Sequence, residues 1–182
     1  MKRTDARVRY TQRVLKEALL SLLGEKPINK ITVKEVCALA ELNRATFYTH
    51  YRDCFALLES IENELVEEFR QSLERANPFH VSSLIEAIYG IVEKHDAACR
   101  VLIFGQVSPS VLQRMIDAAR DKSMDYWREA LHNASEDDLA MLYIHLSNGL
   151  MHVVVEGYER FSRKAVVEFV DRIVKSSLTL FR

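Results

Sequence analysis

Few residues in this sequence of 182 can interrupt a helix, because it contains only five Gly and three Pro. A β-sandwich or β-barrel needs many tight turns, and Gly and Pro supply the backbone conformations of most of them. Apolar residues make up 48% of the sequence and charged residues 28%, which suits a packed core and excludes a disordered or collagen-like chain. We therefore expect an all-α fold with long helices.

The spacing of apolar residues predicts about nine helices. In the first of them, Leu15, Ala18, Leu19 and Leu22 recur at the three-and-four spacing of one helix face. The predicted helices span residues 5–23, 33–40, 44–50, 53–75, 83–95, 97–104, 110–132, 136–161 and 163–181.

Two of the predicted helices, at residues 33–40 and 44–50, are short and lie close together. Thr32 precedes the first, and Glu35 three residues later completes the pattern of a capping box. Asn43 can cap the second. Two short helices with a brief break between them, after one longer helix and before another, have the arrangement of a helix-turn-helix motif.

The residues of this motif match a known family in order and spacing. The stretch ITVKEVCALAELNRATFYTHYRD, preceded by RVLKEALLSLL, resembles the DNA-binding domain of the tetracycline-repressor (TetR) family of bacterial regulators. The resemblance covers about residues 8–65, and TFYTHYRD is its most specific part. It implies a three-helix, helix-turn-helix DNA-binding domain over residues 1–54 and a helical domain for ligand binding and dimerisation over residues 55–182.

The second short helix has the residues of a recognition helix. Such a helix lies in the major groove with polar or basic side chains outward and an apolar face against its scaffold. Arg44 can address a guanine bidentately, and Ala45 or Thr46 can contact a thymine methyl group. Phe47 and Tyr51 fit the inner face.

The resemblance implies contacts to phosphates as well. It assigns them to Tyr48 and His50, and to Thr32 and Lys34 at the start of the preceding helix; such contacts fix the register on DNA without reading sequence. The predicted DNA-binding residues are Thr32, Lys34, Arg44, Ala45, Thr46, Tyr48, Thr49 and His50.

Charge is divided unevenly along the chain. The net charge of −1 argues by itself against nucleic-acid binding. Residues 1–54, however, contain 11 basic and 6 acidic residues, a net charge of +5, and the remaining 14 basic and 20 acidic residues give residues 55–182 a net charge of −6. The positive charge therefore lies on the part that resembles a DNA-binding domain, which favours phosphate attraction there.

Two residues depart from the family pattern. Glu41 stands in the turn, where the family usually has Gly, so it must take a left-handed backbone conformation unless the turn differs. Cys54 stands where the family often has Lys, which removes one expected phosphate contact. These departures keep open an alternative function, a protein-interaction adaptor or co-activator that retains the fold without binding an operator by itself.

In residues 55–182, aromatic and His residues are candidates to line a cavity for a small-molecule effector. They could equally be core or dimer-interface residues. The predicted ligand-binding residues are Tyr89, Phe104, Tyr126, Trp127, Tyr143, His145 and His152. His145 and His152 lie seven residues apart without a third ligand, so we expect no metal site.

The resemblance also implies a homodimer formed through the last two helices. Their apolar faces fit such an interface, and a purely intramolecular core is the alternative that residue spacing leaves open. The residues of these faces are Leu139, Leu142, Leu146, Leu150, Val153, Val166, Phe169, Val170, Ile173 and Leu180.

Motifs of enzymes, cofactor sites and membrane anchors are not found. The sequence lacks GxGxxG, P-loop, HExxH and GxSxG patterns, and it lacks the roughly 20-residue apolar run of a membrane span. We therefore expect no enzyme, no cofactor and no membrane association. With the resemblance, these observations predict a cytoplasmic repressor of the TetR type. The resemblance implies that it binds a palindromic double-stranded DNA operator as a homodimer and is released by a small-molecule effector.

Overall fold

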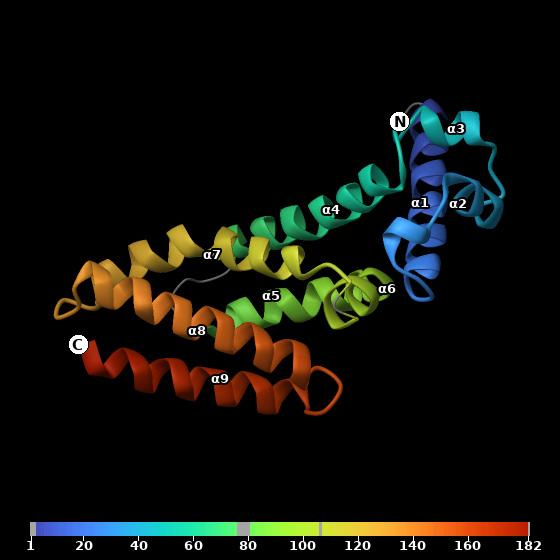
Figure 1. Ribbon diagram of the computed structural model, residues 1–182. Helices are drawn as coiled ribbons and strands as arrows, with labels where there is room; N and C mark the ends of the chain where they lie inside the picture. Colours follow the sequence, from blue (N-terminus) through green and yellow to red (C-terminus); the bar gives the residue numbers. More distant parts are fainter. Residues whose placement is uncertain (1–2, 76–80, 106, 182) are drawn as a thin grey trace. The chain divides into compact units, whose positions relative to one another are not determined.

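The computed structural model describes residues 3–75, 81–105 and 107–181 (Figure 1). These residues form nine α-helices and no strand, which confirms the all-α prediction. The helices are α1 (Arg3–Leu23), α2 (Val33–Leu39), α3 (Arg44–Tyr48), α4 (Cys54–Arg75), α5 (Val81–Lys94), α6 (Asp96–Cys99), α7 (Pro109–Ala130), α8 (Glu136–Gly157) and α9 (Arg163–Leu178).

Side-chain caps set where several of the helices begin. Before α4, Asp53 Oδ1 accepts a hydrogen bond from Ala56 N at 2.7 Å. Before α8, Ser135 and Asp138 form a capping box, with Asp138 N donating to Ser135 Oγ at 3.1 Å and Ser135 N donating to Asp138 Oδ2 at 3.0 Å. Each cap satisfies backbone donors that have no partner within the helix. Both caps agree with the helix starts predicted at residues 53 and 136.

The helix predicted at residues 97–104 differs in its second half. After α6 the chain continues as a π-helical turn, Arg100–Phe104, and Gly105 N donates to Arg100 O at 2.8 Å. A Cβ atom at Gly105 would lie 2.6 Å from Val101 O, closer than real Cβ contacts come. The wider turn thus ends at a residue without a side chain, a requirement that apolar spacing does not reveal.

The chain divides into two compact units. The amino-terminal unit comprises the residues up to Leu65 together with Ala97–Val107. The carboxy-terminal unit comprises Val66–Asp96 and the residues from Ser108 onward. This division falls within α4, later than the boundary expected after residue 54, and it adds to the amino-terminal unit a segment that the sequence placed elsewhere.

The core of the amino-terminal unit holds the helix-turn-helix motif in place. Within it α1 packs against α2, and α2 packs against α3. Leu15, Leu19, Val36, Phe47 and Leu57 are completely buried there. They come from α1, α2, α3 and α4, so all four helices share one apolar centre.

In the carboxy-terminal unit, part of the apolar surface of the last two helices is buried within the chain itself. In it α8 packs against α7 and α9, and α9 packs against α5 (Figure 1). Leu139, Leu142, Leu146, Val166 and Val170 are buried between these helices within a single chain. For these five residues the intramolecular alternative holds, because their side chains already have partners in their own unit.

Other residues of α8 and α9 remain exposed. Met141 and Ile144 on α8 are each 61% exposed, and on α9 Phe169 is 42% and Ile173 39% exposed. Leu180, in the short helical turn after α9, is 80% exposed. These five residues, named here the exposed apolar face, lie on the sides of α8 and α9 that do not face the core.

Apolar residues therefore occur on both the buried and the exposed side of α8. By length and composition alone it is, among the described residues, the one helix that could cross a membrane, although the apolar-run argument from sequence predicted none. Only 33% of its apolar window is buried, and core helices of soluble proteins pass the same test. Its buried side forms the core of the carboxy-terminal unit, and its other side contributes to the exposed apolar face.

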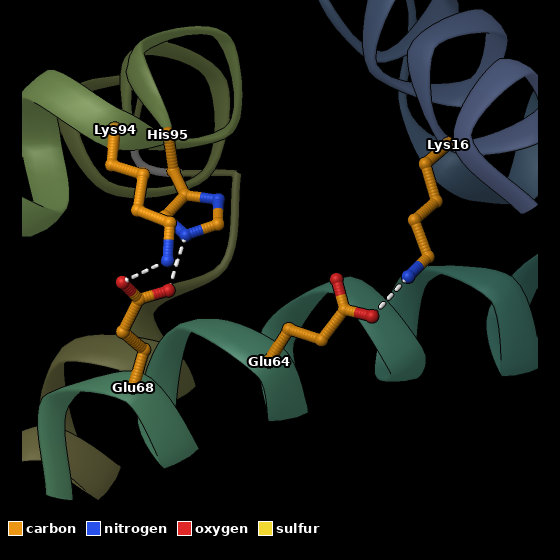
Figure 2. A network of polar contacts seen from close by, with 5 residues as sticks. All are labelled: Lys16, Glu64, Glu68, Lys94 and His95. Carbon is orange, nitrogen blue, oxygen red and sulfur yellow. Dashed lines mark hydrogen bonds and ion pairs between the residues drawn. The ribbon is translucent and has the colours of Figure 1, made fainter. Parts of the chain in front are cut away.

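α4 makes ionic contacts in both units through two acidic residues one turn apart (Figure 2). Glu64 pairs with Lys16 of α1 in the amino-terminal unit. In the carboxy-terminal unit, Glu68 lies 2.6 Å from Lys94 Nζ and 2.5 Å from His95 Nε2, at the end of α5. Burial raises the pKa of Glu68, but the hydrogen bonds from Lys94 and His95 outweigh burial and leave that pKa below its usual value.

Candidate nucleic-acid interface and ligand cavity

The turn between α2 and α3 is a Schellman motif with Glu41 at its left-handed position. Leu42 N donates to Cys37 O at 2.9 Å, and Glu41 N donates to Ala38 O at 3.3 Å. Glu41 has a φ of 53°, the one positive φ among the described non-glycine residues. Of the two conformations considered from the sequence, the left-handed one is therefore present, at a cost of about 1 kcal/mol or slightly more relative to Gly.

The start of α2 is fixed by the predicted capping box. Glu35 N donates to Thr32 Oγ1 at 3.3 Å, and Thr32 N donates to Glu35 Oε2 at 2.9 Å. Lys26 pairs with the other oxygen of the same carboxylate. The hydrogen bond from Lys26, followed by those from Thr32, lowers the pKa of Glu35 to about 2, so this carboxylate stays ionised beside the predicted phosphate contacts.

α3 is held by aromatic residues on its inner side. Phe47 is completely buried and Tyr51 is 9% exposed, with their ring centroids 5.9 Å apart. The rings of Tyr48 and Phe47 form an edge-to-face pair with centroids 5.6 Å apart, and Tyr48 remains 57% exposed. The helix therefore has a fixed inner face and presents a phenol on its outer face.

The structure places the eight predicted DNA-binding residues on or next to α2 and α3. Thr32, Lys34, Arg44, Ala45, Tyr48 and Thr49 are exposed, and Thr46 and His50 are half-buried. The hydroxyl groups of the three Thr residues all donate internally. Thr32 Oγ1 donates to Glu35 at 2.7 Å, Thr46 Oγ1 to Asn43 at 3.0 Å, and Thr49 Oγ1 to Thr46 O at 2.6 Å.

These internal hydrogen bonds distinguish the Thr residues from the predicted residues whose side-chain donors have no internal acceptor. A hydroxyl group has one proton, and phosphate oxygens only accept, so each Thr would have to give up its internal bond to donate to DNA. The side chains of Lys34 and Arg44 have no hydrogen bond or ion pair within the described ranges. Among the eight predicted residues, Lys34, Arg44 and Tyr48 are therefore the exposed side-chain donors that need not give up an internal bond to reach DNA.

Two residues near α3 change the expected set of contacts. Cys54, at the position where the family often has Lys, is 4% exposed, and burial is the main cause that raises the pKa of its thiol. It packs inward as a neutral side chain. Arg52, which the sequence interpretation passed over, has a 78% exposed side chain 3.5 Å from Asp53. In the sequence, Arg52 could have been noticed as a basic residue directly before Asp53, the cap of α4.

The carboxy-terminal unit contains a cavity of about 190 Å³. Its walls come from α4, α5, α7, α8 and α9 and are mostly apolar. Among the predicted ligand-binding residues, Tyr126, Trp127 and Tyr143 line it. Burial raises the pKa of Tyr143 to about 12, and its hydroxyl group donates to Ile116 O, so the phenol is neutral.

The other four predicted ligand-binding residues do not line this cavity. Tyr89 is buried beneath Arg163, whose guanidinium lies 5.1 Å from the ring centroid, and Phe104 belongs to the amino-terminal unit. His145 and His152 are exposed on α8. Residues seven apart share a helix face, and theirs is opposite to the face of Tyr143, so aromatic and His content alone did not identify the lining.

The lysine residues of the cavity wall were not predicted from the sequence. Lys122 and Lys175 line the cavity together with Ser123 and Asp171. The available signal was a charged residue at the three-and-four spacing of an apolar helix face, since Lys122 lies between Ala119 and Tyr126 of α7. Aromatic content alone does not reveal such a residue.

Sequence comparison relates a stretch of this chain to a transcriptional regulator. No protein-family model matches the chain. The chain is 36% identical over 62 residues to the HTH-type transcriptional regulator YxbF of Bacillus subtilis. The match covers 34% of this chain and 15% of that relative, so the chain spans a small part of the relative's length.

Structure comparison extends over nearly the whole chain. A TetR transcriptional regulator from Streptococcus agalactiae matches with a TM-score of 0.66 and 22% identity, covering 98% of this chain and 97% of that one. The dihydroxyacetone kinase operon activator DhaS matches with a TM-score of 0.64 and 12% identity, covering 94% and 98%. The chain therefore has the fold of TetR-family transcriptional regulators.

Proposed function

We propose that this chain is a transcriptional regulator that binds a palindromic DNA operator as a homodimer, with α3 of each copy in the major groove. The observation that carries the proposal is the outer side of the motif, where Lys34, Arg44 and Tyr48 are exposed while Phe47 and Tyr51 fix the inner side. Helix-turn-helix dimers read half-sites about 34–36 Å apart, which sets the spacing expected for the operator.

The predicted residues take different roles in this proposal. Arg44 reads a guanine, and Ala45 and the methyl group of Thr46 contact thymine methyl groups. Lys34, Tyr48 and His50 contact phosphates. Because their hydroxyl protons are committed internally, we assign Thr32 and Thr49 to holding the ends of α2 and α3 at the DNA surface.

The exposed apolar face supports a second copy of the chain as partner. Large apolar side chains gathered on one surface mark interaction sites. Those of α8 and α9, led by Met141, Ile144, Phe169 and Ile173, remain between 39% and 61% exposed. We propose that they pack against the same residues of a second chain, which requires a two-fold symmetric interface.

The cavity supports regulation by a small molecule. A ligand that binds one state of the dimer more tightly than another shifts the balance between them. We propose that a ligand in the cavity releases the operator, which makes the protein a repressor acting in the cytoplasm. α4 is the proposed connection, because it contributes to the cavity wall and also carries Glu64, the partner of Lys16 near the motif.

An adaptor or co-activator without operator binding of its own is the second candidate. The buried thiol of Cys54 favours it, because a phosphate contact expected of the family is missing. A structural neighbour of the same fold is named an operon activator, so an activating role also fits this architecture.

A gel-shift experiment with the DNA upstream of the chain's own gene separates the two candidates. The operator-binding regulator forms a complex that survives excess random DNA and weakens as salt rises, because phosphate contacts release counterions. The adaptor forms no specific complex at any salt concentration. Purified full-length protein is used, with random DNA of equal length as control.

A further inference from the structure

The size of the cavity in the carboxy-terminal unit limits what it can hold. Its volume of about 190 Å³ exceeds the roughly 150 Å³ of an engineered apolar cavity that takes benzene, so a molecule somewhat larger than benzene fits. Phe69 and Leu73 of α4 belong to its wall. A ligand in this space therefore contacts the helix that also extends into the amino-terminal unit.

Apolar side chains make up most of the wall and come from each of the other helices around the cavity as well. Ile88 of α5, Met115 of α7, Leu146 of α8 and Val174 of α9 are all buried. Their side chains offer no hydrogen bond, so a polar group against them would lose its water without gaining another partner. The main part of a ligand must therefore be apolar.

The charged side chains of the lining are already engaged by the protein. Lys175 Nζ lies 2.6 Å from Asp171 Oδ2, so these two opposite charges compensate each other. Lys122, the third charged lining residue, donates to the carbonyl of Leu73 and has a further interaction within the chain. A charged ligand would have to leave water and then compete for groups that already have partners, which disfavours its binding.

The hydroxyl groups of the lining do not supply a charge either. Tyr143 donates its proton to Ile116 O, and Ser147 donates its proton to Tyr143 O at 2.6 Å. Burial raises the pKa of Tyr143 to about 12, so its phenol is neutral at physiological pH. Ser123 contributes one neutral hydroxyl group. None of these groups can balance a charge on a ligand.

We propose that the cavity binds an uncharged apolar molecule, somewhat larger than benzene, as the effector. The inference rests on the proposed role of the cavity as the effector site and names the chemical class of that effector. It excludes small organic acids and amines in their ionised forms, because either ion would be buried without a partner for its charge.

Trp127 makes the proposal measurable without DNA. It is the single Trp of the sequence and it lines the cavity, so its fluorescence reports occupancy. The probes are ethylbenzene, benzyl alcohol and benzylamine at neutral pH, which share a benzyl group and end in a methyl, a hydroxyl or an ammonium group. Benzoate supplies a negative charge. The rise in melting temperature on binding is a second readout.

Ala119 offers a way to fill the cavity. It lies on α7, lines the cavity and is 8% exposed. Ala119→Leu places a larger side chain in the same space, which leaves less room for a ligand. Ala165→Leu makes the same change at an exposed position of α9 outside the cavity and is the matched control.

We expect ethylbenzene to bind the wild type most tightly, benzyl alcohol about tenfold more weakly, and benzylamine and benzoate at least about a hundredfold more weakly. Ala119→Leu should weaken ethylbenzene binding at least about tenfold, whereas Ala165→Leu should leave it unchanged. Circular dichroism shows whether Ala119→Leu is folded. The comparison of the four probes on the wild type does not depend on that variant.

Three results would overturn the proposal: benzoate or benzylamine binding as tightly as ethylbenzene, a folded Ala119→Leu binding ethylbenzene as tightly as the wild type, or no probe changing the fluorescence or the melting temperature at millimolar concentration. The outcome is independent of operator binding. If ethylbenzene binds as expected but the gel shift shows no specific complex, the ligand class stands and the proposed function fails; the reverse result rejects the ligand class alone.

Discussion

α3 and α8 both present one face to solvent, but the two faces are built from different residues. On α3, Arg44 and Tyr48 are exposed over a buried Phe47. On α8, Met141 and Ile144 are exposed over a buried Leu142. Polar donors suit phosphates and base edges, whereas large apolar side chains suit another protein surface. Burial on one side of a helix therefore has to be known before its other side can be assigned to a partner.

The largest expected effect concerns the α8 side. Ile144→Glu places a charge in the exposed apolar face, so the free energy of dimerisation should fall by about 2 kcal/mol or more, roughly a thirtyfold rise in the dimer Kd. Sedimentation equilibrium measures the change. His132→Glu, which adds the same charge at an exposed position outside this face, is the control. A dimer equally stable in both variants would remove the contrast between α8 and α3.

A smaller effect is expected in the turn before α3. Glu41→Gly relieves the left-handed conformation at φ 53° and should raise the free energy of unfolding by about 1 kcal/mol. Ala38→Gly, at an exposed position within α2, should lower it by a similar amount and serves as the matched control. Urea unfolding followed by circular dichroism tests both. Loss of stability in Glu41→Gly would contradict the strain assigned to this turn.

The smallest effect is the pH dependence of the cap on α2. The pKa of Glu35 lies near 2 in the folded chain and near 4.5 in its reference state, so its ionised form stabilises the fold above about pH 4.5. That contribution disappears as pH falls from about 4.5 to 2. The wild type should therefore exceed Glu35→Gln in melting temperature at pH 7, and the difference should close toward pH 2. A pH-independent difference would show that ionisation of Glu35 is not its cause.

Local sequence was sufficient to predict the helix-turn-helix motif. Thr32, Glu35 and Asn43 cap through bonds to residues three positions away, so their pattern carries the structural information directly. Phe47 and Tyr51 pack inward as expected. The internal hydrogen bonds of the Thr hydroxyl groups were not predicted, because a sequence pattern gives the residue type but not the acceptor to which its hydroxyl group donates.

Packing between distant helices limited the prediction of the carboxy-terminal unit. Leu142 and Ile144 look equally apolar in sequence, but only Leu142 is buried in α8, which packs against α7 and α9. The same reason placed His145 outside the cavity and Lys122 on its wall. Which side of a helix becomes core depends on helices far along the chain. Apolar spacing reveals the helical period of a segment, but it does not reveal which other helix packs against it.

Equilibrium binding of fluorescent duplexes tests the central claim, that the outer face of α3 recognises DNA. The duplexes carry the sequence bound in the gel shift or a random sequence, and the proteins are wild type, Lys34→Ala, Tyr48→Phe and Arg44→Ala. Lys34→Ala and Tyr48→Phe should weaken binding to both duplexes by similar factors, since phosphates carry no sequence information. Arg44→Ala should cost about 1–3 kcal/mol on the specific duplex and clearly less on the random one, so that discrimination falls. Equal losses on both duplexes for all three variants would contradict the assignment of Arg44, and unchanged binding in all three would contradict the interface.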